Sequence, residues 1–406
     1  MRFDLHLRST VREQIMQLAE RMKLCEEQPR LSDYEKKRIS ERISPFAHTT
    51  NHNQMVVAGA EGSGDFPCVA YGDSFIYVAV ARTAIYKTDT ISGLREVGPE
   101  PEAVFHFSLI PGDNGERLVS IDEAFASLAG ASLSEIIESS DYQHLKAAEA
   151  RRASSSDNLR RNLIRPHAAD AGNIGIQLRT TAELGAVLRL LRSDIKLSYV
   201  LIGGTLSLPL VGKPDVSLFY EHLKRLCCVE ARKRGTGFFT ISKAHGFPSI
   251  ETVEELARGK SGAKDEAIAE HWYLRLPVRG VDRWETTLTQ TRRLPPPGTV
   301  TYLVRFHSTS PTVRLDMDRE FWLRAVHGAT EDTTRANEER IFGSLDYLTH
   351  DQRCYGYPYP LRAAHDRATL SMSERIALRK QVIDVAVRAG MKRSLFREVT
   401  QGTHSE

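Results

Sequence analysis

The chain has 406 residues, of which 41% are hydrophobic and 26% charged, and its net charge is only +3 at pH 7. This length allows a large hydrophobic core, in one elaborated domain or in two to three domains. The small net charge excludes a global field that would attract nucleic acid, so any basic binding surface must be local. The five cysteines have no framework spacing, which suits reduced thiols in the cytoplasm. No apolar stretch is long enough to span a bilayer, so no membrane role is expected.

Residues 1–45 are predicted to form an N-terminal helical segment, because apolar residues recur at near-helical spacing among charges. This segment is either a packing helix or a dimer arm. The main domain is expected to span residues 46–395, followed by a flexible tail at 396–406.

The rest of the chain alternates between strand and helix patterns, which predicts an α/β sheet with extra strands at both ends. Expected strands are Met55–Ala60, Phe75–Ala81, Ala84–Thr88, Val104–Leu109, Tyr199–Ile202, Phe238–Ile241, Trp272–Leu276 and Thr301–Phe306. Expected helices cover 120–150, 178–192, Val216–Arg234 and a final helix from Ser371, where Ser371 and Glu374 form a capping box. Expected loops are 151–161 and 258–268.

Two of the predicted strands end in the same kind of turn. Met55–Ala60 runs into Glu61-Gly62-Ser63, and Tyr199–Ile202 runs into Gly203-Gly204-Thr205. A carboxylate at such a strand end is held by the sheet and open to a ligand, and two of them form a cation cradle suited to phosphodiester hydrolysis. Glu61 is therefore a candidate metal ligand, although it could also be an exposed turn residue.

Glu183 is the second candidate acid. It lies in a helix with an apolar face, and Arg179 precedes it by one turn, where it could pair with Glu183 or face a phosphate. The alternative is structural, because Thr180-Thr181-Ala182-Glu183 has the form of a capping box at a helix start.

Two further candidates are Lys243 and His365. Lys243 follows the strand Phe238–Ile241, where a lysine can neutralise a phosphate or simply be solvated. The segment Gly356-Tyr357-Pro358-Tyr359-Pro360-Leu361-Arg362-Ala363-Ala364-His365 has two prolines, which favour a rigid turn leading into a helix. His365 could bind metal or move a proton, or serve a structural role.

Basic residues also gather in four short clusters, which could follow a phosphate backbone or form solvated helix faces. They are Arg151-Arg152, Arg160-Arg161, Lys224-Arg225 and Arg232-Lys233-Arg234. The sequence contains no zinc-spaced Cys/His set, no Walker A loop and no GxGxxG motif.

Taken in order, these motifs over residues 50–390 resemble the NurA family of nucleases. The matching elements are Glu61-Gly62-Ser63, Arg179 with Glu183, Gly203-Gly204-Thr205, Ser242-Lys243 and the block from Gly356 to His365. The resemblance implies an RNase H-like mixed sheet flanked by helices, a homodimer, and DNA cleavage that depends on Mn²⁺ or Mg²⁺. It also implies a HerA-type hexameric ATPase as partner, in DNA-end processing, DNA repair or antiviral defence against phage.

The chain departs from the family pattern at two positions. Glu61 stands where the family has its first Asp, and Gly203 stands where it has the second. Losing a carboxylate from a metal site removes a charge and an oxygen donor. Asp65 and Asp73 are the local candidates to replace it. Two hypotheses follow: a nuclease with weak activity that Gly203→Asp would raise, or a scaffold that has lost its chemistry.

Overall fold

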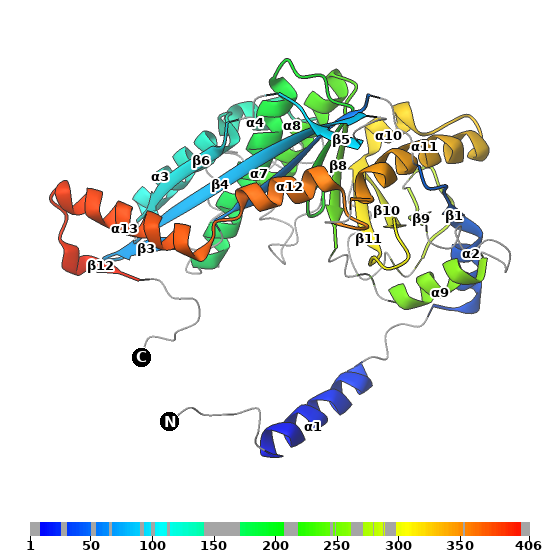
Figure 1. Ribbon diagram of the computed structural model, residues 1–406, viewed down its shortest axis with the longest axis horizontal. Coiled ribbons are helices and arrows are strands. Elements are labelled where there is room, and N and C mark those ends of the chain that lie inside the picture. Colours follow the sequence, from blue (N-terminus) through cyan, green and yellow to red (C-terminus); the bar gives the residue numbers. More distant parts are fainter. Residues whose placement is uncertain are drawn as a thin grey trace.

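The computed structural model describes residues 9–25, 31–49, 54–64, 67–89, 93–98, 102–111, 114–141, 171–206, 218–243, 247, 249–260, 271–278, 280–286, 288, 298–351 and 354–398. These residues form an α/β fold in which one mixed sheet carries helices on both faces (Figure 1). The expected fold class is thereby confirmed. No helix in the described part of the chain is long and apolar enough to cross a membrane.

The sheet has twelve strands in the described residues, in the order β1-β9-β10-β11-β8-β7-β2-β4-β3-β12, and β5 and β6 also pair with β4. The strands are β1 (Ile43–Pro45), β2 (Val56–Ser63), β3 (Pro67–Tyr71), β4 (Ser74–Asp89), β5 (Gly93–Glu96), β6 (Val104–Ile110), β7 (Tyr199–Gly203), β8 (Gly237–Ser242), β9 (Trp272–Arg275), β10 (Thr299–Arg305), β11 (Val313–Asp318) and β12 (Phe396–Arg397).

The centre of the sheet is parallel, and it places the two strand ends of interest side by side. β2 pairs with β7 in parallel, with Ala60 opposite Ile202, and β7 pairs in parallel with β8. Glu61 and Gly203 therefore follow at the same end of the parallel pairing, as the shared sequence pattern predicted. The turn expected at Glu61-Gly62-Ser63 is wrong, because β2 continues through these residues by pairing with β4. Both strands are apolar and buried because helices cover both of their faces.

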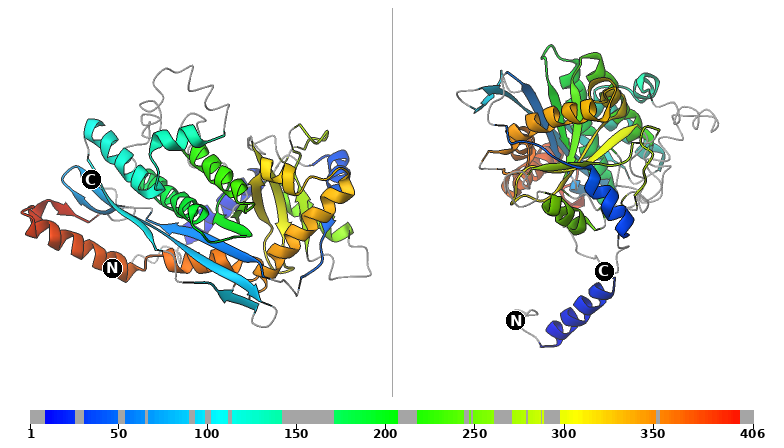
Figure 2. Two further views of the ribbon diagram at one scale, coloured as in Figure 1. Left: turned by 90° about the horizontal axis from the view of Figure 1, so that it is seen from above. Right: turned by 90° about the vertical axis from the view of Figure 1, so that its right-hand side faces the viewer.

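Helices from two parts of the sequence cover the two faces, as the left view of Figure 2 shows. Residues of α3, α7 and α8 share one apolar core with Ala58 and Ala60, while residues of α10, α11 and α12 share another with Val57 and Leu201. The helices are α1 (Ser9–Cys25), α2 (Asp33–Arg42), α3 (Asn114–Ala129), α4 (Leu133–Ser139), α7 (Ala171–Arg192), α8 (Leu218–Lys233), α9 (Ile250–Lys260), α10 (Arg319–Ala325), α11 (Glu331–Thr349), α12 (Tyr359–Ala368) and α13 (Met372–Arg388), with a 3₁₀ turn at Arg393–Leu395.

Several expected boundaries differ from the structure. The two strands expected at Phe75–Ala81 and Ala84–Thr88 form one continuous strand, β4, because no glycine or proline interrupts them and β2 pairs across the junction. The expected loop at 258–268 begins inside α9. The segment expected to be helical up to residue 45 ends in the short strand β1.

At the other end of the chain, Phe396 and Arg397 pair with β3, although we expected a flexible tail from residue 396. The capping box of Ser371 and Glu374 is confirmed at the start of α13.

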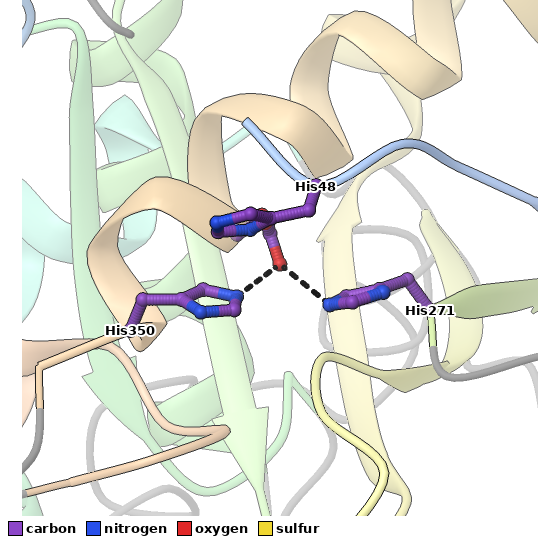
Figure 3. A group of neighbouring side chains, drawn as sticks. His48, His271 and His350 are labelled. Atoms are coloured by element: carbon purple, nitrogen blue, oxygen red, sulfur yellow. Dashed lines mark hydrogen bonds and ion pairs between the residues drawn. The ribbon is translucent and has the colours of Figure 1, made fainter. Parts of the chain in front are cut away.

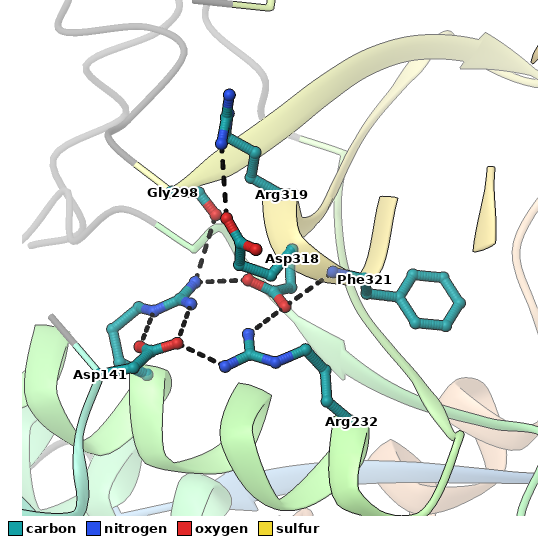
Figure 4. Close-up of polar contacts among 8 residues, drawn as sticks. Asp141, Arg232, Gly298, Asp318, Arg319 and Phe321 are labelled. Atoms are coloured by element: carbon teal, nitrogen blue, oxygen red, sulfur yellow. Dashed lines mark hydrogen bonds and ion pairs between the residues drawn. The ribbon is translucent and has the colours of Figure 1, made fainter. Parts of the chain in front are cut away.

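Two of the arginines in the predicted basic clusters lie in an ion-pair network inside the protein (Figure 4). Arg225 binds both oxygens of Asp141 at 2.8 Å and Asp318 at 2.5 Å, and Arg232 contacts the same two carboxylates. Asp318 is 1% exposed and also caps α10 through the Phe321 amide. Arg225 and Arg232 therefore join α8 to the far half of the sheet and do not form a phosphate-binding face, while Arg151-Arg152 and Arg160-Arg161 lie outside the described residues.

Replacing Asp318 by asparagine is expected to lower the free energy of unfolding by about 3–5 kcal/mol, because it removes the more deeply buried of the two carboxylates that neutralise Arg225 and Arg232. Denaturant unfolding of the purified variant measures this loss. The matched control is Asp366→Asn, which removes an exposed carboxylate paired with Arg362 at 3.0 Å and should cost about 0.3–0.5 kcal/mol. Equal losses for the two variants would contradict the structural role of the network.

Candidate functional site

A cleft of about 440 Å³ opens where β2, β7 and β8 end. Four residues that the sequence singled out separately line it together: Glu61, Glu183, Lys243 and His365. The other lining residues are Ile176, Arg179, Thr180, Leu184, Ile202, Gly203, Gly204, Thr205, Lys224, Thr240, Ile241, Ser242, Tyr357, Leu361 and Arg362. The tertiary fold thus gathers side chains that are up to 304 positions apart in sequence (Glu61 to His365).

Glu61 reaches across the end of β7. A Cβ atom built on Gly203 would lie 2.6 Å from Oε2 of Glu61, so the carboxylate fills the space that a side chain at position 203 would enter. Arg82 on β4 is directly opposite Glu61 in the antiparallel register, which places a positive charge beside it on the same face of the sheet. The longer side chain of Glu61 and the missing side chain of Gly203 are therefore spatially complementary.

Glu183 enters the cleft from α7. This helix begins at Ala171, so Glu183 lies in its interior and does not cap a helix start, which excludes the capping-box interpretation. Its carboxylate is 3.3 Å from Nε of Arg179, one turn earlier. Glu183 as a whole residue is 7% exposed. A Cβ atom on Gly62 would lie 2.9 Å from Oε1 of Glu183, so this glycine lets the acid approach β2.

The two carboxylates approach β2 from opposite faces. Gly59, two residues before Glu61 and on the same face, lies against the start of α12: a Cβ there would be 2.3 Å from the carbonyl oxygen of Pro360. Gly62 points to the other face, where α7 and Glu183 lie. The cleft at the strand ends is the place where both acids are accessible to one ligand.

The proline-rich segment forms the turn and helix that the sequence predicted. Pro358 is the N-cap of α12, with Pro360 in its first turn, and α12 carries His365 to the cleft as an exposed side chain. The Nε2 atom of His365 is 3.5 Å from the hydroxyl of Thr369. Because the prolines restrict the backbone, His365 projects from a defined position.

Tyr357 connects the charged groups of the cleft. Burial raises the pKa of its hydroxyl well above the usual value, and the negative charges of Glu61 and Glu183 raise it further. The ammonium of Lys243 lies 4.2 Å from the centre of the Tyr357 ring, a cation–π contact. Both acids thus act electrostatically on one phenol, and that phenol positions the lysine.

The turn after β7 is held by the sheet. The amide of Gly204, whose φ is +98°, donates to the carbonyl of Ile241 at 3.0 Å, and the amide of Leu206 donates to Asp316 at 3.0 Å. Lys224 of α8 is 5% exposed and also lines the cleft. From the sequence, Lys224 was predicted only as part of a basic cluster. Its helical spacing from the apolar residues of α8 indicates that it faces inward.

Of the two acids expected to compensate for Gly203, only Asp73 lies in the described structure, and it does not line the cleft. Asp73 is exposed in the turn between β3 and β4. Eight residues of β4 separate this turn from Arg82, the partner of Glu61, which corresponds to roughly 26 Å of strand. Asp73 therefore cannot join Glu61 on one cation, and Asp65 lies outside the described residues.

Comparison with known proteins gives matches among solved structures. No family profile matches the chain, and no curated protein matches its sequence. The crystal structure of the NurA nuclease from Sulfolobus solfataricus aligns over 94% of this chain and 96% of its own, with a TM-score of 0.46 and 12% identity. The chain is similar to NurA nucleases.

Two further NurA structures match at comparable length. NurA with bound dAMP and manganese aligns over 96% of this chain and 99% of its own, with a TM-score of 0.40 and 13% identity. NurA with manganese aligns over 95% and 99%, with a TM-score of 0.38 and 12% identity.

Proposed function

We propose that this chain is the nuclease subunit of a DNA-processing complex and hydrolyses phosphodiester bonds in DNA with the help of a divalent cation. The observation that carries the proposal is the convergence of Glu61 and Glu183 with Lys243 and His365 on one cleft at the ends of parallel strands. Ligands bind at this edge of α/β sheets, outside the carboxyl ends of the strands.

The donor set suits Mn²⁺ or Mg²⁺. Carboxylate oxygens are the ligands these hard cations prefer, and Glu61, Glu183 and His365 would hold the ion. When bound, such an ion lowers the pKa of a coordinated water and neutralises charge on the phosphate. We expect Mn²⁺ to support activity better than Mg²⁺, since Mg²⁺ demands near-ideal octahedral geometry and this lining offers few carboxylates.

The other groups of the cleft suit the substrate. Lys243, held over Tyr357, and the buried Lys224 would place positive charge beside the scissile phosphate. Arg179, paired with Glu183, fixes that carboxylate. The two roles of His365 are alternatives: an imidazole that does not ligate the ion would instead accept the proton of the attacking water.

A second candidate function is supported by the number of acids. Among the described residues that line the cleft, only Glu61 and Glu183 carry carboxylates. Such a site fits a scaffold subunit that binds DNA and an ATPase but no longer cleaves DNA. The position of Glu61 over Gly203 favours the enzyme, because the longer side chain places an oxygen where the missing acid would have reached.

Linear DNA incubated with purified protein and either Mn²⁺, Mg²⁺ or EDTA tests the proposal. If the chain is a nuclease, we expect cleavage in Mn²⁺, slower cleavage in Mg²⁺ and none in EDTA. The same reactions with a HerA-type hexameric ATPase test whether a motor that feeds DNA increases the rate. DNA binding without cleavage under every condition would support the scaffold.

For assembly, we propose a cytoplasmic homodimer that docks on the HerA-type ring in DNA-end processing, DNA repair or antiviral defence. The exposed apolar side chains of α1 support a dimer, because an apolar stripe at helical spacing is normally covered. α1 lies apart from the sheet in Figure 1. Its exposed apolar residues are Ile15, Met16, Leu18 and Met22, each between 57% and 65% exposed.

Deleting residues 1–28 is expected to halve the mass measured by light scattering, because it removes α1 but keeps Leu31 and Ile39, which are buried in the core. The point variant Leu18→Glu should have the same effect without shortening the chain. Glu13→Gln, on the same helix, is the control and should leave the mass unchanged. A dimer that survives both the deletion and Leu18→Glu would show that α1 is not the dimer element.

A further inference from the structure

Three histidines and one aspartate gather near β1 and β9, at one end of the strand order and outside the cleft. His48 follows β1, His271 directly precedes β9, and Asp346 and His350 lie one turn apart at the end of α11. One nitrogen or carboxylate oxygen from each of the four lies within 4.8 Å of those of the other three. None of them lines the cleft of Glu61 and Glu183.

The imidazoles of His48, His271 and His350 point toward one another (Figure 3), and the carboxylate of Asp346 contacts all three. Its Oδ2 atom is 2.7 Å from Nδ1 of His48, and its Oδ1 atom is 2.9 Å from Nε2 of His350 and 3.6 Å from Nε2 of His271. The Asp346 side chain is fully buried, that of His271 is 8% exposed, and those of His350 and His48 are 24% and 37% exposed. The cluster thus combines two buried side chains, Asp346 and His271, with two that are partly exposed.

The backbone holds the four residues in place. β1 pairs with β9, and the amide of Phe46 donates to the carbonyl of His271 at 3.2 Å, which sets His48 beside His271. The amide of Thr49 donates to Oδ2 of Asp346 at 3.0 Å. A Cβ on Gly343 would lie 2.8 Å from the hydroxyl of Thr49, so this glycine lets the segment approach α11.

We propose that His48, His271, Asp346 and His350 bind one Zn²⁺ ion as a structural site. Three imidazoles and one carboxylate match the ligand types and the number of protein ligands in closed zinc sites. Ligand atoms around a tetrahedral zinc are about 3.3 Å apart at the usual bond lengths of about 2.0–2.1 Å. Oδ1 of Asp346 lies 2.9 Å from Nε2 of His350 and 3.6 Å from Nε2 of His271, close to this separation, and Nδ1 of His48 lies 2.7 Å from the other oxygen of the same carboxylate.

The ion would join the N-terminal strand to the last turn of α11. Without it, the same link depends on hydrogen bonds from two partly exposed imidazoles to Asp346. Carboxylates that bind a metal are usually held by a further hydrogen bond, and the Thr49 amide supplies such a bond to Asp346. Binding to the folded chain alone would raise its stability.

Zinc content and cobalt spectra of the full chain test this site. Protein equilibrated with Zn²⁺ and then desalted is expected to hold one zinc per chain by elemental analysis. Co²⁺ in its place should give the visible absorption of a four-coordinate ion. His48→Gln and His350→Gln should each lower the retained zinc at least 10-fold, and both positions are exposed enough to tolerate the change.

Two controls separate this site from the cleft and from a general loss of histidines. His307→Gln removes a neighbouring imidazole whose ring lies 6.0 Å from that of His350 and which bonds to Thr309, so zinc should be retained. The pair Glu61→Gln and Glu183→Gln removes the acids of the cleft and should also leave the zinc in place. Zinc that is absent from the unmodified chain, or that survives His48→Gln with His350→Gln, would overturn the proposal.

Discussion

Glu183→Gln is expected to lower Mn²⁺-dependent DNA cleavage by at least about 100-fold, and Glu61→Gln should do the same. Each substitution keeps the shape of the side chain but removes one negative charge from the cation site. A metal that stabilises transition-state charge contributes several kcal/mol, and each 1.36 kcal/mol corresponds to a tenfold change in rate. Single-turnover cleavage of end-labelled linear DNA measures the effect, and calorimetric titration with Mn²⁺ measures the accompanying loss of binding.

Asp73→Asn is the matched control, because it makes the same chemical change at an exposed turn roughly 26 Å along the strand from the partner of Glu61. It should cleave DNA and bind Mn²⁺ like the unmodified chain. If Glu61→Gln and Glu183→Gln also retain full activity while they are folded, the cleft is not the catalytic site.

Gly203→Asp is expected to gain little activity by itself, whereas Glu61→Asp combined with Gly203→Asp should raise Mg²⁺-dependent cleavage at least tenfold. From the sequence alone we expected the single change to restore the missing acid. The structure alters this expectation, because a side chain at position 203 would meet the carboxylate of Glu61 at 2.6 Å from its first atom. Shortening Glu61 clears that space and recreates the pair of aspartates that the resemblance implies.

The two exchanges should therefore be strongly non-additive, as expected for residues in contact. Gly203→Ala separates shape from charge: it should displace Glu61 and lower activity in Mn²⁺ without adding an acid. Rates of the four chains of the double-mutant cycle, measured in Mg²⁺ and in Mn²⁺, provide the test. A single Gly203→Asp variant as active as the double variant would show that Glu61 and position 203 act independently.

Local chemistry determined much of what the sequence predicted. The apolar runs before Glu61 and Gly203 are buried parallel strands because their residues have strand propensity and nothing polar to expose. The Ser371 capping box and the proline-led start of α12 depend only on neighbouring residues, so both appear where they were expected. Their order along the chain was enough to place Glu61, Glu183, Lys243 and His365 as candidates around one site.

Other features needed the tertiary structure, because the groups that cause them are distant in sequence. β11 carries Arg314 and Asp316 in a fully buried strand, where the two side chains pair at 2.7–2.8 Å and the Leu206 amide and the Thr301 hydroxyl also donate to Asp316. From the sequence, Arg225 and Arg232 could follow a phosphate backbone or form a solvated helix face. The structure instead pairs them with Asp141 and Asp318. The interior position of Glu183 follows from α7 beginning seven residues earlier than its apolar pattern indicated.

The histidine cluster shows the same limit most clearly. Its ligands come from the ends of β1, β9 and α11, and only Asp346 and His350 have a local signature, the four-residue spacing of one helix face. A search for zinc spacing in the sequence therefore finds nothing. In the same way, Glu61 fills the space beside Gly203 only because β2 and β7 are neighbouring strands. The effect of a change at either position on the site therefore depends on the residue at the other.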